Sequence, residues 1–270
     1  TEAALLDNRT HFDRESFDLT LWGGIVSKPR ALGKVMAEAS YFGLNERDSP
    51  GRPTRNRNLH TISARIIRDP APRRLDFEAE AIYQLGSIRA DLSAAARELD
   101  VSAWFAHVDI GYSFAGGWKP RLSLEYDYAS GDGRGRNFGR FDTLFGMRRA
   151  DLGPAGIYAA LGRTNISTPG LRVEVAPSKR LDAFTVYRPL WLASKTDSFS
   201  TTGVRDPNGR SGSFAGQQLE GRVRYWLVDQ RLRAELNAVW LIKGRFLRDA
   251  PNAPATGDTH YVSLALTTNF

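Results

Sequence analysis

Two carboxylates alternate with apolar residues in the segment RLSLEYDYASGD, residues 121–132. Glu125 and Asp127 are two residues apart, so on an extended strand they share one face, about 7 Å from each other. A glycoside hydrolase uses two carboxylates at a separation of this order, one as the acid and the other as the base or nucleophile. Any strand with a polar face produces the same spacing, however, so the pair alone does not predict an enzyme.

Other side chains that support catalysis or metal binding are scarce. His107 and Asp109 share a strand face, but no serine is placed to complete a hydrolytic triad. The absence of cysteine excludes disulfides, a thiolate nucleophile and a thiolate-bound metal. The sequence contains no phosphate-binding loop and no histidine pair with zinc spacing, and the loop from Asp127 to Gly133 lacks EF-hand ligand spacing. We therefore predict a protein that is not an enzyme and has no cofactor or metal.

The composition favours an anionic partner, because the net charge of the 270 residues is +7. The basic run 47–57 lacks the interleaved aromatic residues of a nucleic-acid patch, so we expect a loop that touches lipopolysaccharide and no nucleic acid. No segment reaches the roughly 18 apolar residues of a transmembrane helix, and no signal peptide opens the chain. Because the sequence begins with Thr, we interpret it as a processed chain or a fragment.

Strict alternation of apolar and polar residues predicts about eleven β-strands of roughly 9–13 residues. Such strands are long for a soluble sheet and fit tilted strands that cross a membrane. The facing of the strand within 181–193 is ambiguous, because the Arg188-Pro189 pair suggests a bulge. We expect Leu124 and Tyr126 to meet lipid together with Val223 and Tyr225, and the Glu125 and Asp127 face to look into a water-filled lumen.

The predicted connections alternate between short and long. Short links lie at 27–33, 69–73, 115–119, 177–180 and 228–230, and long polar links at 46–57, 86–98, 130–164, 195–214 and 247–258. This alternation is typical of an outer-membrane barrel with tight periplasmic turns and larger external loops. The predicted fold class is therefore all-β, an antiparallel transmembrane β-barrel of the bacterial outer membrane. The alternative is a soluble sandwich or jelly roll, whose second set of alternate positions would be buried rather than charged.

Several motifs resemble one known family closely over roughly residues 120–270 and more loosely before that. They are YDYASGDG, FDTLFGMRRADLGPAGIY, NISTPGLRVEVAPSKRLDAF, YRPLWLAS, STTGVRDPNGRSGSFAGQQLEGRVRYWL and KGRFLRDAPNAP. These stretches resemble the alginate-export family of bacterial outer-membrane proteins. The resemblance implies an eighteen-stranded monomeric barrel whose narrow, basic lumen conducts an anionic polysaccharide outward, supplied by periplasmic secretion proteins. It also implies contact with outer-membrane lipid and lipopolysaccharide.

The number of predicted strands differs from that family. An odd set of about eleven strands cannot close a barrel in the usual way, and it would place the first residue outside the cell. We therefore expect residues 1–270 to form a single barrel domain that lacks about seven N-terminal strands. The strands at 15–26 and 260–270 should then each have one unpaired edge or pair with strands outside the given sequence.

The charged alternate positions predict the path of the substrate. Carboxylates concentrate on the earlier strands and cations on the later ones, so an acidic and a basic wall should face each other across part of the pore. Arginine suits a uronate track, because its planar fork grips a carboxylate at two oxygens while several weak sites still allow release. We expect local ion pairs of Arg222 with Glu220 and of Arg233 with Glu235. The predicted substrate-path residues are Arg172, Arg188, Arg222, Arg224, Arg233, Lys243, Arg245, Glu125, Asp127 and Asp109.

The long segment 130–164 is predicted to fold into or over the outer mouth, with a short helix after Pro154. The candidate outer-mouth residues in this segment are Asp132, Arg134, Asp142, Arg148 and Arg149. The alternative is that the segment is a solvated external loop.

Two other functions stay open from the residues. A general anion-preferring diffusion porin would have a wider pore, form trimers and discriminate little among anions. An outer-membrane phospholipase is a formal rival that an assay for lipid hydrolysis would detect.

Overall fold

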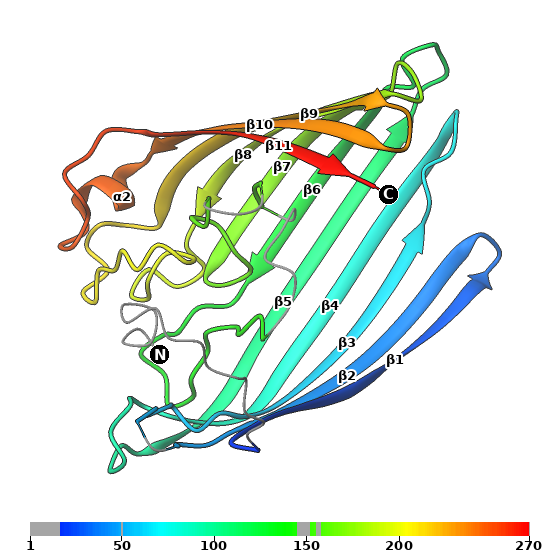
Figure 1. Cartoon of the computed structure of the whole chain (residues 1–270). Coiled ribbons are helices and arrows are strands. Elements are labelled where there is room, and N and C mark those ends of the chain that lie inside the picture. Colours follow the sequence, from blue (N-terminus) through cyan, green and yellow to red (C-terminus); the bar gives the residue numbers. More distant parts are fainter. Residues whose placement is uncertain (1–16, 50, 145–151, 155–157, 270) are drawn as a thin grey trace, which may run out of the picture.

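A computed structural model of the chain describes residues 17–49, 51–144, 152–154 and 158–269. These residues form one eleven-stranded antiparallel sheet in which each strand pairs with its neighbours in sequence (Figure 1). The predicted meander is therefore confirmed. The strands are β1 Leu19–Leu32, β2 Val35–Glu46, β3 Asn58–Arg68, β4 Arg74–Arg89, β5 Glu98–Ser113, β6 Arg121–Ala129, β7 Ile166–Val175, β8 Leu181–Trp191, β9 Phe214–Val228, β10 Leu232–Lys243 and β11 Thr259–Thr268.

Short and long connections lie at opposite ends of the sheet, as the sequence predicts. The short turns, residues 33–34, 69–73, 114–120, 176–180 and 229–231, lie at the upper right in Figure 1. We call this the short-turn end. The long connections, residues 47–57, 90–97, 130–165, 192–213 and 244–258, form the long-loop end at the lower left. Two residues suffice between β1 and β2, where Gly33 adopts φ +63°, a conformation that is easiest for glycine.

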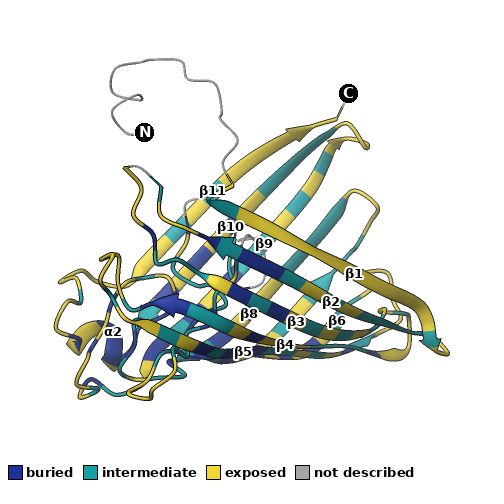
Figure 2. Ribbon diagram, turned by 90° about the horizontal axis from the view of Figure 1, so that it is seen from below, coloured by how far each residue is buried: buried dark blue, intermediate teal, exposed yellow. Residues whose placement is uncertain are grey.

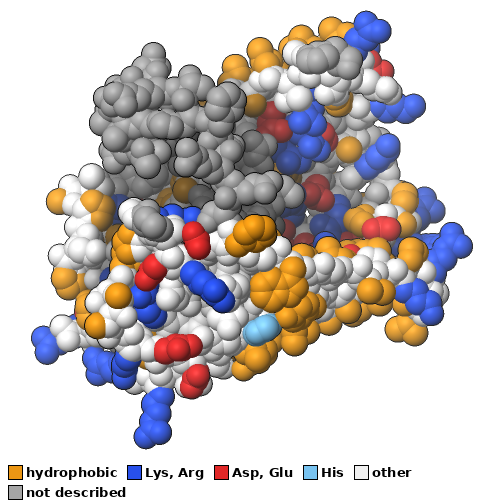
Figure 3. Space-filling view, turned by 60° about the horizontal axis from the view of Figure 1, so that its bottom comes forward, with side chains coloured by type: hydrophobic (Ala, Val, Ile, Leu, Met, Phe, Trp, Pro, Cys, Tyr) orange, Lys and Arg blue, Asp and Glu red, His pale blue; other side chains and the backbone are white. Residues whose placement is uncertain are grey.

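The sheet is curved, with an apolar convex face and a charged concave face (Figures 2 and 3). Leu124 is 66% exposed on the convex face, and Tyr126, Val223 and Tyr225 are exposed there as well. Asp127, on the opposite face of the same strand as Leu124, is only 2% exposed. The predicted facing of the alternate positions is confirmed. The described residues form a single sheet, with no second sheet over these apolar side chains, which argues against a sandwich.

Both outer strands of the sheet have one free edge within the described part of the chain. There β1 pairs only with β2, and β11 pairs only with β10. Closure of a barrel is therefore not found among these residues. The two unpaired edges agree with the prediction for the first and last strands.

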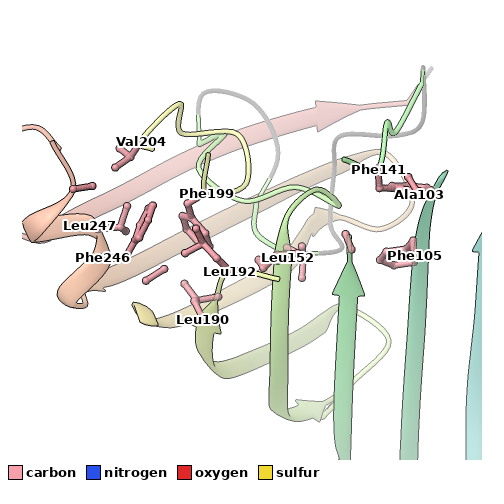
Figure 4. Packing of buried hydrophobic residues seen from close by; sticks show 14 of the residues in the cluster. Ala103, Phe105, Phe141, Leu152, Leu190, Leu192, Phe199, Val204, Phe246 and Leu247 are labelled. Atoms are coloured by element: carbon pink, nitrogen blue, oxygen red, sulfur yellow. The ribbon is translucent and has the colours of Figure 1, made fainter. Parts of the chain in front are cut away.

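An apolar core occupies the concave side at the long-loop end (Figure 4). Along β5, the concave positions change from Asp109 and His107 to Phe105, which is fully buried. The long loops fold back onto these apolar strand ends, and the ring of Phe141 lies 5.8 Å from that of Phe105. Phe199 from the 192–213 loop is also fully buried. Burying one such aromatic side chain contributes about 1.5–3 kcal/mol, so the core anchors the loops to the sheet.

Three local features differ from the sequence-based expectations. The irregularity in β8 falls between Leu190 and Trp191, one residue beyond the predicted bulge at Arg188-Pro189. The described residues of the expected helix, 152–154 and 158–164, are not helical, and the remainder lies outside the described residues. A helix that was not predicted, α2 (Arg245–Asp249), follows β10. In the described ranges, no helix has the length and apolarity needed to cross a membrane.

Candidate functional site: the charged concave face

The concave face carries two groups of charge on different strands. The first group, on β4–β6, combines six carboxylates with two arginines, and we call it the acidic wall. The second group, on β8–β10, combines five cations with three carboxylates, and we call it the basic wall. The carboxylates of the acidic wall are Asp76, Glu78, Glu80, Asp109, Glu125 and Asp127; the cations of the basic wall are Arg188, Arg222, Arg224, Arg233 and Lys243. The face is therefore polarised rather than uniformly basic.

Arg188 joins the two walls in the middle of the sheet. Its Nη2 lies 3.0 Å from Glu125 Oε2 and its Nη1 lies 3.5 Å from Asp127 Oδ2. Arg188 is 1% exposed, and both carboxylates are buried. Asp127 also contacts His107, whose Nδ1 lies 2.7 Å from Asp127 Oδ1. Both carboxylates that resemble a glycosidase pair are thus engaged in a buried network that ties β5, β6 and β8 together.

A glycine makes the contact between β6 and β8 possible. Gly170 of β7 lies between the two strands on the concave side, opposite Glu125. A Cβ at this position would lie 3.2 Å from Glu125 Oε2, so a larger residue would crowd the carboxylate that Arg188 contacts. Arg172, two residues further along β7, contacts the other oxygen of Glu125 at 3.7 Å and Glu174 at 2.6 Å.

The sequence analysis did not single out Arg121, which organises the acidic wall near the short-turn end. Its Nε lies 2.9 Å from Asp76 Oδ1, and its guanidinium also binds Asp109. The group lies directly over Gly111, where a Cβ would come within 2.4 Å of it. Arg121 is four residues before Glu125 on the same strand, so the two-residue period could have placed it on this face.

One arginine of the basic wall, Arg222, and one from the neighbouring strand β7, Arg172, lie against the same aromatic ring. The guanidinium carbons of Arg172 and Arg222, from the strands on either side, lie 4.0 and 4.5 Å from the ring centroid of Phe184 on β8. Such cation–π contacts hold a guanidinium plane without neutralising its charge. Arg222 and Arg224 share one carboxylate, Asp182, at 3.6 and 2.9 Å. The expected pair of Arg222 with Glu220 is thus replaced by a pair with Asp182, since Glu220 accepts a hydrogen bond from Gln218.

These side chains line a cleft of about 360 Å³ at the short-turn end of the concave face. Besides Phe184, Arg222 and Arg224, its lining includes Lys119 and Arg121. Within the described part of the chain, Nε of Arg222 is buried without a hydrogen-bond partner, and so is Nε of Arg233. Arg233 does not line the cleft, whose lining has four cations, Lys119, Arg121, Arg222 and Arg224, against two carboxylates, Glu174 and Asp182.

The remaining cations of the predicted path lie in different settings. Arg233 pairs with Glu235 at 3.9 Å, as expected, and lies 5.5 Å from the ring of Trp226. Lys243 is buried, and its Nζ donates to the carbonyls of Pro254 and Thr256 and to the Thr256 hydroxyl, which uses all three donors. Arg245 lies outside the strands, exposed on α2, and pairs with Asp249 at 3.5 Å.

The long loops, which contain the predicted outer-mouth residues, are bound to one another and to the concave face. Asp132 accepts a hydrogen bond from the Gly139 amide, and its own amide donates to Asp197 of the next loop. Asp142 pairs with Arg57 at 2.7 Å. Arg134 is exposed and donates to the Pro207 carbonyl. The other two candidates in this loop, Arg148 and Arg149, lie outside the described residues.

Part of the 130–165 loop reaches the far side of the concave face. The Tyr158 hydroxyl donates to Gln218 of β9, and the Gln218 side-chain amide donates to the Leu152 carbonyl at 3.0 Å. The ring of Tyr158 lies 5.5 Å from that of Tyr261 on β11. Burial raises the pKa of Tyr158 above its usual range, so this hydroxyl stays protonated and remains a donor. Contacts over such sequence distances leave no local signal in the chain.

No cluster suited to a metal ion is found among the described residues. What the face offers instead is several arginines at short intervals, each able to bind a carboxylate or phosphate by charge-assisted hydrogen bonds.

A meander of long strands, apolar on its convex face and charged on its concave face, is typical of the class of β-barrel transport proteins. A comparison with sequence profiles of known families finds a match to alginate export over residues 5–259 of the chain. The chain therefore belongs to the alginate export family, a transport family, as the resemblance in the sequence predicts. No protein with a curated function matches the chain significantly.

Proposed function

We propose that this chain forms the wall of an outer-membrane channel that exports an anionic, alginate-like polysaccharide. The observation that carries the proposal is the excess of arginines around Phe184 and Asp182 of β8. Arg222 and Arg224 share the single carboxylate of Asp182, and Arg172 and Arg222 stack on Phe184. A uronate carboxylate at this place would find guanidinium donors that the protein's own carboxylates leave unused.

The convex face supports a position in a membrane. Its side chains include Leu124, Val223 and Tyr225, which are between 43% and 66% exposed with no protein layer over them in the described chain. Lipid would cover such a surface at little cost, whereas water would not. Unpaired backbone groups are expensive in hydrocarbon, so we further propose that strands beyond these eleven cover the free edges of β1 and β11 and close the barrel.

The polarised concave face suits the passage of a polyanion. The acidic wall repels the polymer, and the basic wall offers several weak sites instead of one tight one, which allows binding and release in turn. Low-dielectric walls concentrate the field of the arginines in the cleft and strengthen the attraction beyond its value in bulk water.

Neutralising the shared pair tests this function. In the double variant Arg222→Gln and Arg224→Gln, we expect a lower anion-to-cation permeability ratio in planar bilayers. Block of the current by an oligouronate should weaken by about tenfold for each lost charge-assisted hydrogen bond. Glutamine preserves much of the side-chain volume and avoids placing new carboxylates beside Asp182.

The matched control is Arg65→Gln, which removes a concave charge from β3, where Arg65 pairs with Glu78 at 2.6 Å. This variant should leave the block nearly unchanged. An unaltered block in the double variant, with normal insertion, would contradict the proposal. Equal weakening for small anions and for oligouronates would indicate a general anion-preferring porin.

A further inference from the structure

Exposed cations lie in or next to all five short turns. We call Arg30, Arg73, Lys119, Arg180 and Arg231 the basic rim; four of them lie in the turns, and Arg30 lies two residues before the end of β1, beside the first turn. Asp69 and Asp229 are the only carboxylates in these turns. Figure 3 shows Lys and Arg side chains along the right-hand edge of the molecule, which is the short-turn end. The rim is therefore a band of like charge along one end of the sheet.

The rim differs from the arginines at the opposite end in lacking ion pairs. At the long-loop end, Arg57 pairs with Asp142, Arg89 with Asp48 and Arg140 with Asp197. No member of the basic rim has a carboxylate partner in the part of the chain that the structure describes. Its charge is consequently available to an anion outside the protein.

The backbone at the tips indicates that the charges matter more than the turns. Arg30, Arg73 and Lys119 adopt φ values of +60°, +59° and +46°. This region is strained for a residue with a side chain and is usually occupied by glycine or asparagine. A long cation at three of these five positions is thus unfavourable for the backbone, which points to a role for its ammonium or guanidinium group.

Large apolar side chains alternate with the rim and identify its surroundings. Leu32 is 77% exposed, Trp118 is 66% exposed and Leu75 is 59% exposed, each within two residues of a rim cation. A band that only captured a polymer from water would gain nothing from these exposed side chains. Aromatic and aliphatic groups next to Lys and Arg are instead typical of the boundary between hydrocarbon and headgroups.

We propose that the basic rim binds the phosphodiester headgroups of anionic phospholipids in the leaflet that surrounds the short-turn end. This inference rests on the membrane position proposed above. The arginine forks bind phosphate oxygens, while Leu32, Leu75 and Trp118 enter the adjoining acyl region. The bound headgroups fix the depth of the short-turn end and hold the cleft open toward the water beside that leaflet.

Lipid selectivity in bilayers tests the proposal. The protein is reconstituted in phosphatidylcholine containing spin-labelled phosphatidylglycerol or spin-labelled phosphatidylcholine, and the motionally restricted fraction of each label is measured. The wild type should prefer phosphatidylglycerol, and the preference should fall as salt is raised from 0.1 to 1 M, roughly, because screening shortens the range of the attraction. The triple variant Arg30→Gln, Arg73→Gln, Lys119→Gln should lose most of the preference for phosphatidylglycerol. Each cation near an anionic surface increases the affinity for that surface about fivefold.

The matched control removes three exposed cations from the long-loop end, Arg97→Gln, Arg136→Gln and Arg248→Gln, and should keep the preference. Equal loss in both variants, or no preference in the wild type, would overturn the inference. If the rim variant keeps the wild-type lipid preference but is blocked more slowly by oligouronate added at the short-turn side, the rim captures polymer and the inference is overturned. Complete absence of a restricted lipid component would instead contradict the membrane position itself.

Discussion

Arg188 is the largest fully buried side chain of the described residues, and it is charged. Taking a guanidinium out of water is costly unless carboxylates compensate it, and here Glu125 and Asp127 do so from a strand two positions away. The cluster therefore fixes the spacing of three strands at the centre of the concave face. Its burial suggests a structural contribution for Arg188 within the predicted substrate path.

Removing this one charge should be far more damaging than removing an exposed one. Arg188→Met removes the buried cation between the two carboxylates and, among the described residues, leaves Glu125 with only the longer contact to Arg172 and Asp127 with only His107, so we expect the free energy of unfolding to fall by about 3–5 kcal/mol. Arg65→Met removes a half-exposed arginine and should cost about 0.2–1 kcal/mol. Urea unfolding of both variants in lipid vesicles measures the difference. Similar losses in the two would show that the Arg188 network does not stabilise the sheet.

At the scale of elements, the long loops hold the mouth through apolar packing. Phe199 of the 192–213 loop is fully buried in the core at the long-loop end. Phe199→Ala should therefore lower the stability of this region by about 3–5 kcal/mol and expose the loop to protease. Phe214→Ala, at a half-exposed convex position, should leave proteolysis of the loop unchanged. Equal cleavage of Phe199→Ala and wild type would contradict an anchoring role.

The same loop carries a carboxyl group that makes its order depend on pH. The backbone amide and hydroxyl of Ser211 donate to Asp206, which lowers the pKa of its carboxyl group to about 2. In the unfolded chain the pKa of an aspartate is about 3.9, higher than in the folded loop. The ionised carboxylate therefore stabilises the loop fully above about pH 3.9, and this stabilisation is lost as the pH falls through the pKa of the folded state. Protection from pepsin should thus persist at about pH 4 and disappear near pH 2.

Ser211→Ala supplies the comparison for this prediction. Without the hydroxyl donor, the carboxyl group of Asp206 should protonate at a higher pH, and cleavage of the loop should begin there. If the variant and the wild type become sensitive at the same pH, the Asp206 carboxyl does not control the order of the loop.

The two-residue period predicts the strands, their facing and the alternation of connections, because each depends on local sequence. The same period also indicates where the loops cover the concave face, because concave positions become apolar there. Val239 and Leu241 occupy the concave positions between Asn237 and Lys243, where a wet wall would be polar. They are apolar because the loops pack there. The docking of Tyr158 on Gln218, across 60 residues, depends on tertiary contacts and has no local signature.

On the scale of the whole molecule, the two faces of the sheet carry different physical demands. In the proposed membrane position, the concave face can accept polar changes where water reaches it, but the convex face must match hydrocarbon in its middle and headgroups at its ends. Val223 lies near the middle of β9, and Leu227 lies one residue from its end at the short turn. Both are half-exposed on the convex face, at 44% and 50%. They form a matched pair that differs in depth.

The cost of an introduced arginine should therefore depend on its position along β9. Val223→Arg places a guanidinium near the bilayer midplane and should lower the free energy of insertion and folding by about 2–4 kcal/mol. Leu227→Arg lies within reach of headgroup phosphates and should cost about 0–1 kcal/mol. Folding yields into vesicles, titrated with urea, measure both values. Equal costs for the two variants would contradict a membrane position for the convex face. On a face covered by water or by protein, the cost of an arginine does not depend on its position along the strand.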